Sequence, residues 1–532
     1  MQRKSKKIAA AVLASIAIGA IGYFVSRESA LLSETERDAA LSAEAVSRVR
    51  SFLDYTVSSI DPETSLFPRD RAGAIWAPRD NAADDYPYAV IAAKLFGKED
   101  DLHALERVLE SERSVTIREN GLVDDYDFDK GRFFLPRDPE RLLLNNAEYA
   151  KDGLLPIVDA LGKDSPWTER LISIIDSIWD AKQLWSSETL PSSRLETNGD
   201  LLQVLSRLYW LTGDEEYLEK ARGIADHYLL TEPLVASGTP LQLRDHANEV
   251  IVGLSELYFA FDHADKNKTV LYRKPLRDLY EAVLEEGRTD EGLVLSSAGG
   301  DALTDNWGYI MNAIRTVADI EDDEGYRAET VRTAEAVASL GERVWEERYP
   351  FDGYADTIES AIMTLSYYPA PPLFSWVAEN MERLWKLEDS LVSKGPNYLY
   401  GNVARTNMLY ALMKSKGFTL EPWPENGGLA AKSGEDGIEL FIYLPPGSEW
   451  KGILKASPAR HSTIWSMPSN YPRINALLEW FVPNADVEYA LSSGPASERS
   501  KVTGARLLEG VALELSESGV IEIAPARLGQ NR

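Results

Sequence analysis

The stretch "ETNGDLLQVLSRLYWLTGDEEYLEKA", residues 196–221, contains two helical patterns joined by a short turn. The first half is apolar on most sides of a helix, which is typical of a buried helix. The second half carries charged and apolar residues at helical spacing, which is typical of a half-exposed helix. We therefore predict a helical hairpin with one largely buried and one half-exposed member.

This hairpin pattern repeats from about residue 35 to about residue 420. Successive buried segments begin 46 to 61 residues apart, near Asp84, Asn145, Asn198, Asp245, Asp305, Asp356 and Asn402. Closing such hairpins into a ring buries every apolar face, whereas an open tetratricopeptide-type solenoid needs a shorter and more regular period. We therefore predict a mainly α fold, an (α/α) toroid of six or seven hairpins with inner and outer helix rings over residues 35–420.

The pattern changes after "EPWPENGG", residues 421–428. From Ile438 onward the chain consists of short β-type runs separated by turns: "IELFIYLP", "GILKAS", "INALLEWFVP", "VEYALSS", "VALELSES" and "VIEIAP". Such alternation over short runs predicts a small antiparallel β-sandwich, which we place at residues 430–527. No catalytic cluster is visible in it.

The first thirty residues have the features of a targeting segment. Four basic residues precede an uncharged run at residues 8–25, which would reach roughly 27 Å as a helix and just match a bilayer core. Residues 1–30 are therefore expected to be either a cleaved signal peptide or a signal anchor. Both predict an exported, periplasmic or extracellular protein, and residues 8–25 would provide its only membrane contact.

Overall charge and composition exclude several classes of function. The chain has 85 acidic and 56 basic residues, and the resulting net charge of -29 repels phosphate backbones, so nucleic acid is not an expected partner. It has no cysteine, hence no disulfide, no thiolate nucleophile and no cysteine metal site. We find no zinc-type grouping and no glycine-rich phosphate loop, so no metal and no cofactor are expected.

Every buried segment begins with Asp or Asn, the residue types that cap helix N-termini. Capping accounts for the first polar residue of each cluster. Further acids lie two to four residues inside four of these helices, at Glu148, Asp200, Glu249 and Glu359. A capping box also places an acid there, so a structural role and a chemical role remain open for each.

If the inner helices run parallel, these acids gather at one mouth of the ring together with arginines, amides and aromatic residues, as a sugar site requires. The candidate catalytic residues are Asp85, Asp245, Glu249, Asp305, Asp356 and Glu359. The candidate substrate-binding residues are Trp76, Arg79, Asn198, Asp200, Arg244, His246, Trp307, Tyr309, Tyr354 and Arg405. In detail, we expect Asp84 to be mainly a cap and Asp85 to face Glu249 or Asp245 across the cavity. Trp76, Trp307 and Tyr309 would form the sugar platform.

The chain resembles the six-hairpin glycosidase-like superfamily over roughly residues 35–420. The resemblance rests on "WAPRDNAADDYPY", "LRDHANEVIVGLSELYF", "DNWGYIMNAI", "DGYADTIESAI" and the opening stretch. The chain is also similar to uncharacterised exported bacterial proteins with the same stretches. The superfamily includes glycoside hydrolases, polysaccharide lyases and sugar epimerases. No single family's catalytic signature matches residue by residue, so no catalytic role is transferred.

The resemblance and the acidic mouth together predict a carbohydrate-active protein with an oligo- or polysaccharide as its partner. A glycoside hydrolase with an Asp/Glu acid–base pair is the leading interpretation. A polysaccharide lyase would instead use a tyrosine or histidine base, and a sugar epimerase is a further alternative. A carbohydrate-binding scaffold without catalysis also remains open.

The loop "DDYDFDKG", residues 124–131, places Asp125, Asp127 and Asp129 at alternate positions, as at the start of a calcium loop. It departs from that motif at Lys130, where glycine is expected, and at Pro136, where the bidentate glutamate should be. We interpret it as a solvated acidic loop near the mouth.

Overall fold

The computed structural model describes residues 33–526, apart from 70–72, 186–189, 237–239, 342–349, 394–398, 435–436 and 494–499. The expected targeting segment, residues 1–30, lies outside these ranges. Of the helices in the described part, none is both long and apolar enough to cross a membrane.

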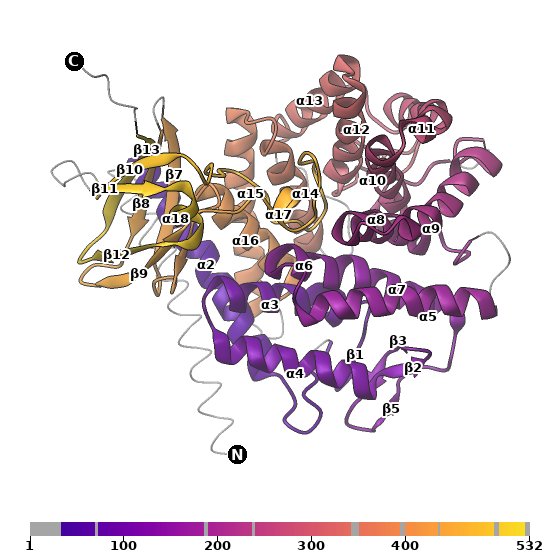
Figure 1. Ribbon diagram of the computed structural model, residues 1–532, viewed down its shortest axis with the longest axis horizontal. Coiled ribbons are helices and arrows are strands. Elements are labelled where there is room, and N and C mark those ends of the chain that lie inside the picture. Colours follow the sequence, from indigo (N-terminus) through magenta and orange to yellow (C-terminus); the bar gives the residue numbers. More distant parts are fainter. Residues whose placement is uncertain are drawn as a thin grey trace.

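The helices of the described ranges form an inner and an outer ring (Figure 1). Seven inner helices pack side by side in a closed circle: α3 (Tyr86–Leu95), α5 (Pro139–Glu148) with its continuation α6 (Leu155–Leu161), α8 (Leu195–Thr212), α10 (Glu249–Ala264), α12 (Trp307–Glu321), α14 (Pro350–Leu365) and α16 (Gly401–Lys414). The last of them, α16, packs against the first, α3. The structure is thus the predicted helical toroid.

Six outer helices each follow an inner helix in the chain and pack against it: α4 (Glu99–Val115), α7 (Pro166–Trp185), α9 (Glu215–Asp226), α11 (Lys266–Glu286), α13 (Glu324–Ala338) and α15 (Pro371–Val392). The seventh pair is formed differently, because the partner of α16 is α2 (Glu34–Ser58), from the other end of the described chain. The first described helix and the last inner helix therefore close the ring together, and the ring has seven helix pairs among the described residues.

Close contact between α8 and α10 depends on two glycines. A Cβ atom on Gly253 would lie 2.5 Å from Cβ of Leu202 and 2.8 Å from the carbonyl oxygen of Gly199. A Cβ atom on Gly199 would lie 2.4 Å from the backbone nitrogen of Val250. Only glycine fits at such distances, so these two positions bring the inner helices to backbone contact.

Two of the inner helices contain a wide, π-helical turn: Asn81–Asp85 immediately before α3, and Tyr149–Leu154 between α5 and α6. The two turns pack against each other, and a Cβ on Gly153 would lie 2.7 Å from the carbonyl oxygen of Ala82. Such turns shift the side chains that follow them around the helix axis. Here they bring residues 79–85 next to residues 148–154.

The residues predicted to cap the inner helices are not their caps, although one inner helix, α5, is capped by another aspartate, Asp138. Two of the expected first residues, Asn145 and Asp356, lie six residues inside helices that begin at Pro139 and Pro350. No side-chain cap is formed at the N-termini of α3, α8, α10, α12 or α16 in the described chain. On the outer helices the pattern is opposite, since Asp214, Asp265 and Asp323 cap α9, α11 and α13.

The region after residue 415 contains two antiparallel sheets (Figure 1). The first has the order β11 (Ser500–Thr503), β10 (Glu488–Ser493), β13 (Gly519–Pro525), β8 (Gly437–Tyr443) and β7 (Gly428–Gly434). The second has the order β12 (Val511–Leu515), β9 (Trp450–Lys455) and β6 (Thr419–Glu421). Strands β7 and β8 pack against α2, so the sheets lie directly beside the seam of the ring.

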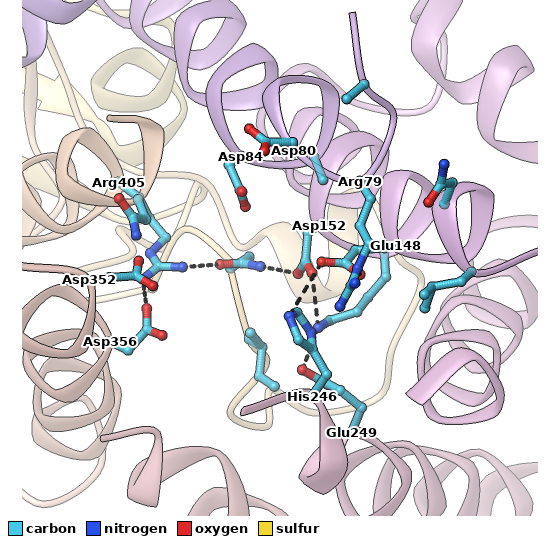
Figure 2. Close-up of a pocket in the computed structure, with 18 of the residues that line it drawn as sticks. Arg79, Asp80, Asp84, Glu148, Asp152, His246, Glu249, Asp352, Asp356 and Arg405 are labelled. Carbon is cyan, nitrogen blue, oxygen red and sulfur yellow. Dashed lines mark hydrogen bonds and ion pairs between the residues drawn. The ribbon is translucent and has the colours of Figure 1, made fainter. Parts of the chain in front are cut away.

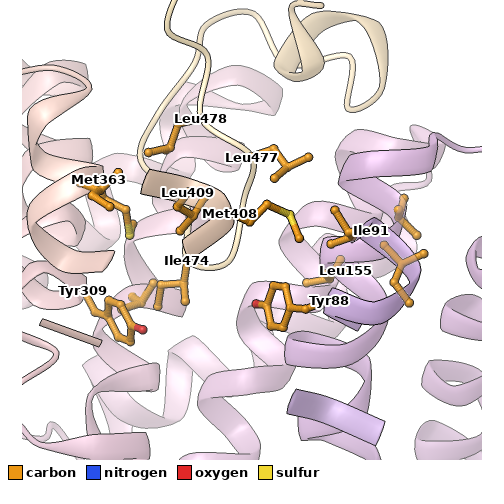
Figure 3. Packing of buried hydrophobic residues seen from close by; sticks show 14 of the residues in the cluster. Tyr88, Ile91, Leu155, Tyr309, Met363, Met408, Leu409, Ile474, Leu477 and Leu478 are labelled. Carbon is orange, nitrogen blue, oxygen red and sulfur yellow. The ribbon is translucent and has the colours of Figure 1, made fainter. Parts of the chain in front are cut away.

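One predicted strand of this region, "INALLEWFVP" at residues 474–483, does not form. The segment has no strand; instead it leaves the sheets and enters the ring, where Ile474, Leu477 and Leu478 lie between the inner helices (Figure 3). Its alternating apolar residues are buried by helices rather than by a second sheet. Periodicity alone cannot distinguish these two ways of burying the same side chains.

A short strand before α3 pairs with short strands from the chain between α4 and α5. Strand β1 (Ile75–Trp76) pairs with β4 (Tyr126–Asp127), which pairs with β5 (Arg132–Phe133). The acids of the calcium-like loop lie in different surroundings here. Lys130 Nζ lies 2.6 Å from Asp127 Oδ2, whereas Asp125 is buried beneath the strands and reaches the ring interior.

Candidate active site

The ring encloses a cavity of about 600 Å³ at the N-terminal ends of the inner helices (Figure 2). Six of the seven inner helices contribute side chains to its wall, and Arg194 lines it immediately before the seventh, α8. This agrees with the shared mouth expected from the sequence. The wall is mostly charged: its acids are Asp80, Asp84, Asp125, Glu148, Asp152, Glu249, Asp352 and Asp356, and its basic residues are Arg69, Arg79, Arg141, Lys151, Arg194, His246 and Arg405.

Asp84 presents its carboxyl group to the cavity from the π-helical turn before α3. Within the described chain no hydrogen bond or ion pair reaches this group. It is accessible from the cavity, yet it lies deep inside the ring, and this enclosure raises its pKa well above the ordinary value. Nearby carboxylates raise the pKa further, namely those of Asp80, Glu148, Asp152 and Asp352.

A cluster of two carboxylates, an arginine and a histidine lies on one side of the cavity. Arg79 donates from Nε to Glu148 Oε2 at 2.8 Å and from Nη2 to Glu196 Oε1 at 2.5 Å. The imidazole of His246 lies 3.5 Å from Glu148 and 3.6 Å from Glu196. Burial raises the pKa of Glu148 to about 7, although His246 and Arg79 oppose the shift.

Lys151 is the centre of a buried ion cluster beneath the first. Its Nζ atom lies 2.5 Å from Glu249 Oε1, 3.1 Å from Asp152 Oδ2 and 3.7 Å from Asp200 Oδ1. Burial alone would lower the pKa of Lys151, but the three carboxylates raise it well above its usual value. Gln203 donates to the second oxygen of Glu249 at 2.6 Å, so this carboxylate is held from two sides.

On the opposite side, Arg405 of α16 holds two acids of α14. It donates to Asp356 and lies 3.2 Å from Glu359 Oε2. The hydroxyl of Tyr309 donates to the same oxygen of Glu359 at 2.6 Å. Burial raises the pKa values of Glu359 and Tyr309, while Arg405 opposes both shifts. Asp356 therefore faces the cavity in a fixed position, and Glu359 helps to hold the Arg405 side chain that binds it.

The floor of the cavity comes from the C-terminal region. Asn475 donates from Nδ2 to Asp152 at 2.6 Å and accepts hydrogen bonds from Tyr88 at 2.9 Å and from Arg405 at 3.2 Å. Its side-chain amide thereby connects the two charged groups on opposite sides of the cavity (Figure 2).

Parts of this chain are similar to several solved structures. No protein-family model and no curated protein matches the chain. Among solved structures, the α-1,6-mannanase GH76A of Salegentibacter sp. HEL1_6 is similar over 57% of this chain and 97% of its own, with 14% identity and a TM-score of 0.40. A GH127 β-arabinofuranosidase is similar over 90% of this chain and 74% of its own, with 12% identity and a TM-score of 0.34. A sugar epimerase from a ruminal bacterium is similar over 57% and 90%, with 13% identity and a TM-score of 0.38.

These likenesses concern the fold. Hydrolases and an epimerase occur together among them, so the choice of reaction rests on the residues of this chain.

The structure brings six of the sequence-predicted residues to the cavity wall: Arg79, His246, Glu249, Tyr309, Asp356 and Arg405. Two more, Asp200 and Glu359, are fully buried behind the wall and contact it through Lys151 and Arg405. Six of these eight belong to one polar network that runs through Lys151, Asp152 and Asn475. The other two, Arg79 and His246, form a second group with Glu148 and Glu196.

The predicted tryptophan platform is wrong. Trp76 is fully buried and packs edge-on against Phe67 and Tyr86, with ring centroids 5.1 and 5.9 Å away. Trp307 is also buried, and its indole N–H donates to Thr357 at 3.0 Å. Tyr354 is buried and lies outside the cavity lining. Core packing decides the position of all three.

Other predicted residues have structural positions. Asp85 accepts the backbone N–H of Gly401 at 2.7 Å and so connects α3 to α16 rather than facing the cavity. Asn198 donates to Ser192 and Tyr228, both at 2.8 Å.

Three more predicted residues, Asp305, Arg244 and Asp245, are not among the described residues that line the cavity. Asp305 accepts the N–H of the next residue at 2.8 Å and is buried. Arg244 is exposed outside the lining. Asp245 begins a 3₁₀ turn, and its side chain lies outside the described part of the chain.

The sequence-based candidate set missed many side chains that the structure places in the cavity, among them Asp84, Lys151, Asp152, Asp352 and Asn475. For two of them a signal existed, because Glu148 and Asp152, and likewise Asp352 and Asp356, are four residues apart and so share a helix face. Asp84 was visible in the sequence, but was interpreted as a cap.

One group has the composition of a metal site. Ligand atoms of Glu148, Glu196 and His246 lie within 4.8 Å of one another. However, the guanidinium of Arg79 is hydrogen-bonded to both carboxylates. This positive charge would repel a cation bound to the same carboxylates. The group therefore fits a hydrogen-bonded wall better than a metal centre.

Proposed function

We propose that the protein is a glycoside hydrolase that binds the end of an oligo- or polysaccharide chain in the cavity, outside the cytoplasm. Asp84 is the general acid that protonates the leaving oxygen, and Asp356 is the partner carboxylate. The proposal rests on the residues of the site, and the likeness of fold to sugar-acting enzymes is consistent with it.

The main support for this proposal is the environment of the Asp84 carboxyl group. A glycosidase needs a carboxylic acid that remains protonated near neutral pH and can be reached by the substrate. Asp84 meets both conditions, because its pKa is raised well above the ordinary value and its carboxyl group is open to the cavity. No cation of the described chain contacts it and favours its charged form.

The partner must be a carboxylate in a fixed place, acting as nucleophile or as base. Asp356 is held by Arg405, whose own pKa is raised, so the guanidinium keeps its charge. Figure 2 shows Asp352 and Asp356 on one side of Asp84, and Glu148 and Asp152 on the other. A sugar between these groups would contact carboxylates on two faces.

Elimination by a polysaccharide lyase is less compatible with the site. A lyase needs a tyrosine or histidine that takes a proton from a sugar carbon. Both tyrosines of the lining donate their hydroxyls to neighbours, Tyr88 to Asn475 and Tyr309 to Glu359. Burial raises the pKa values of both, which opposes the tyrosinate form. Epimerisation is the second candidate, because His246 lines the cavity beside Glu148 and could transfer a proton.

The test is incubation of the purified protein with a panel of oligosaccharides of defined linkage, analysed in three ways. A hydrolase releases new reducing ends without ultraviolet absorbance, a lyase produces an unsaturated, absorbing product, and an epimerase changes only the sugar's configuration. We expect the first result, with products released from one chain end. Binding by calorimetry without any product would instead identify a scaffold and contradict the proposal.

A further inference from the structure

A segment of the C-terminal region, residues 465–478, runs into the ring from the end opposite the mouth. Figure 3 shows Ile474 beside Tyr88 and Tyr309, with Leu477 and Leu478 close to the inner helices. Ile474 and Asn475 line the main cavity, whereas a second cavity of about 210 Å³ is lined by residues 470–473 and 476–479 of the same segment. The segment thus separates two cavities inside one ring.

Buried charges of the inner helices hold this segment in place. Asp159 of α6 accepts hydrogen bonds from the indole of Trp465 at 2.7 Å and from the backbone N–H of Leu477 at 2.9 Å. Glu256 of α10 accepts a hydrogen bond from Tyr471 at 3.1 Å. Both carboxylates are almost completely buried, where an unpaired charge would be costly. Neither lines the main cavity. Glu256 is also paired with Arg207 of α8 at 2.7 Å, so it connects the segment to two inner helices.

A third anchor lies at Asn475, which has φ 59°, in the left-handed region that asparagine tolerates better than most residues. Its backbone N–H donates to Glu359 at 3.3 Å. Its amide donates to Asp152 and accepts from Tyr88 and Arg405. A side chain there must donate and accept at once, which an amide does and a carboxylate or an alkyl group does not.

We propose that Asn475 is a positioning residue: from the C-terminal segment it fixes Asp152 on one side of the cavity and the Arg405–Asp356 pair on the other. The inference rests on the proposed hydrolase function for its catalytic meaning. It also explains the chain-end specificity, because a polymer cannot pass through a ring that this segment closes. The site is complete only when the C-terminal segment is seated.

The first test compares three variants of the full chain. Asn475→Gly removes the amide without strain at the left-handed backbone, and Asn475→Asp keeps the shape but places a carboxylate against Asp152. The control is Leu478→Ala, a packing change in the same segment. On an oligosaccharide that the parent hydrolyses, both Asn475 variants should lower kcat by about tenfold to 10²-fold with a smaller change in KM. Asn475→Asp should also move the pH profile of kcat/KM.

For Leu478→Ala we expect a lower melting temperature with an unchanged pH profile. If the Asn475 variants alter only the melting temperature, as this control does, the positioning role is overturned.

A second test needs no substrate. Unfolding in urea of Asn475→Gly, Asp152→Ala and the double variant forms a double-mutant cycle. We expect a coupling of about threefold or more in the unfolding equilibrium constant, because the two side chains share a hydrogen bond. Absence of coupling overturns the inference. Coupling without turnover on the whole oligosaccharide panel instead overturns the hydrolase proposal and leaves Asn475 as the link across the cavity.

Discussion

Three aspartates at the starts of outer helices and Asp84, just before the inner helix α3, have opposite roles. Asp214, Asp265 and Asp323 accept backbone N–H groups in the first turns of outer helices. For Asp323 this bond, supported by Arg277, lowers the pKa. Asp84, before the inner helix α3, forms no such bond in the described chain, and its pKa is raised.

The two kinds of helix end differ in which protonation state of the aspartate they favour. A cap satisfies the helix and holds the aspartate in its charged form. Where the cap is missing and the ring excludes water, the charged form is disfavoured and the acid keeps its proton. A capping aspartate at the start of an outer helix therefore stabilises the fold. An uncapped aspartate before an inner helix, such as Asp84, can instead supply a reactive acid.

The largest effect is expected from Asp84→Asn. Loss of a general acid should lower turnover by about 10² to 10⁴. The melting temperature should stay the same or rise, and the gain over the parent should be greater at pH 9 than at pH 4. The reason is that the raised pKa makes ionisation of Asp84 a penalty on the folded state, and this penalty exists only above the pH at which an unfolded aspartate ionises. Kinetic assays and thermal melts across pH provide the measurement.

The matched control is Asp85→Asn, one residue further. The amide oxygen can still accept the N–H of Gly401, so activity should remain close to that of the parent. Equal loss of activity in both variants would remove the distinction between a cavity-facing and a wall-building aspartate.

The next effect concerns the pH profile. Glu148 is one of the carboxylates that raise the pKa of Asp84, so Glu148→Gln should move the alkaline limb of kcat/KM to lower pH. Glu196→Gln, which removes the other carboxylate bound by Arg79, should move it less. A shift of the same size in both variants, or in neither, would show that the limb does not report on Asp84.

Glu148 should also affect stability as a function of pH. Its pKa is about 7 in the folded protein and about 4.3 in an unfolded chain, so the folded state binds the proton more strongly. The associated stabilisation is fully present below about pH 4.3 and is lost as the pH rises to about 7. The decline of the melting temperature over this interval should therefore be smaller in Glu148→Gln than in the parent. Parallel declines would contradict the raised pKa.

The smallest effect is expected on the outer ring. Asp214→Ala removes the cap of α9 and should cost about 1 kcal/mol of stability with unchanged turnover. Asp214→Asn should restore most of it, because asparagine is an equally good cap. Chemical denaturation and a standard assay suffice, and any loss of turnover would show that the outer caps also shape the site.

The ring and its shared mouth could be predicted because both follow from local patterns. The repeat period of about fifty residues predicts the helical hairpins, and inner helices that run parallel have their N-termini at one end of the ring. Arg79, His246 and Arg405 were found in this way, since their position in the repeat places them at the mouth. Tyr309 was predicted from its position near the start of an inner helix in the same repeat.

What could not be predicted depends on contacts across the ring. Whether Asp84 or Asp85 faces the cavity is decided by the π-helical turn at Asn81–Asp85, for which the sequence pattern has no signal. The burial of Trp76 depends on its packing with Phe67 and Tyr86. Asn475 meets Asp152 across 323 residues of sequence, a contact that no local periodicity contains.

The pairing of α2 with α16 has a consequence for how the chain folds. Six of the helix pairs can form from neighbouring segments, whereas the seventh joins residues near 40 to residues near 410. The loop-closure entropy of such a pairing is large, and contacts of this range are made slowly. The emerging polypeptide therefore cannot complete its circle until almost all the helices exist. Until α16 and β7 have been synthesised, α2 can pack only against α3 and α4, and most of its native contacts are missing. We therefore expect aggregation during biosynthesis to begin at this helix.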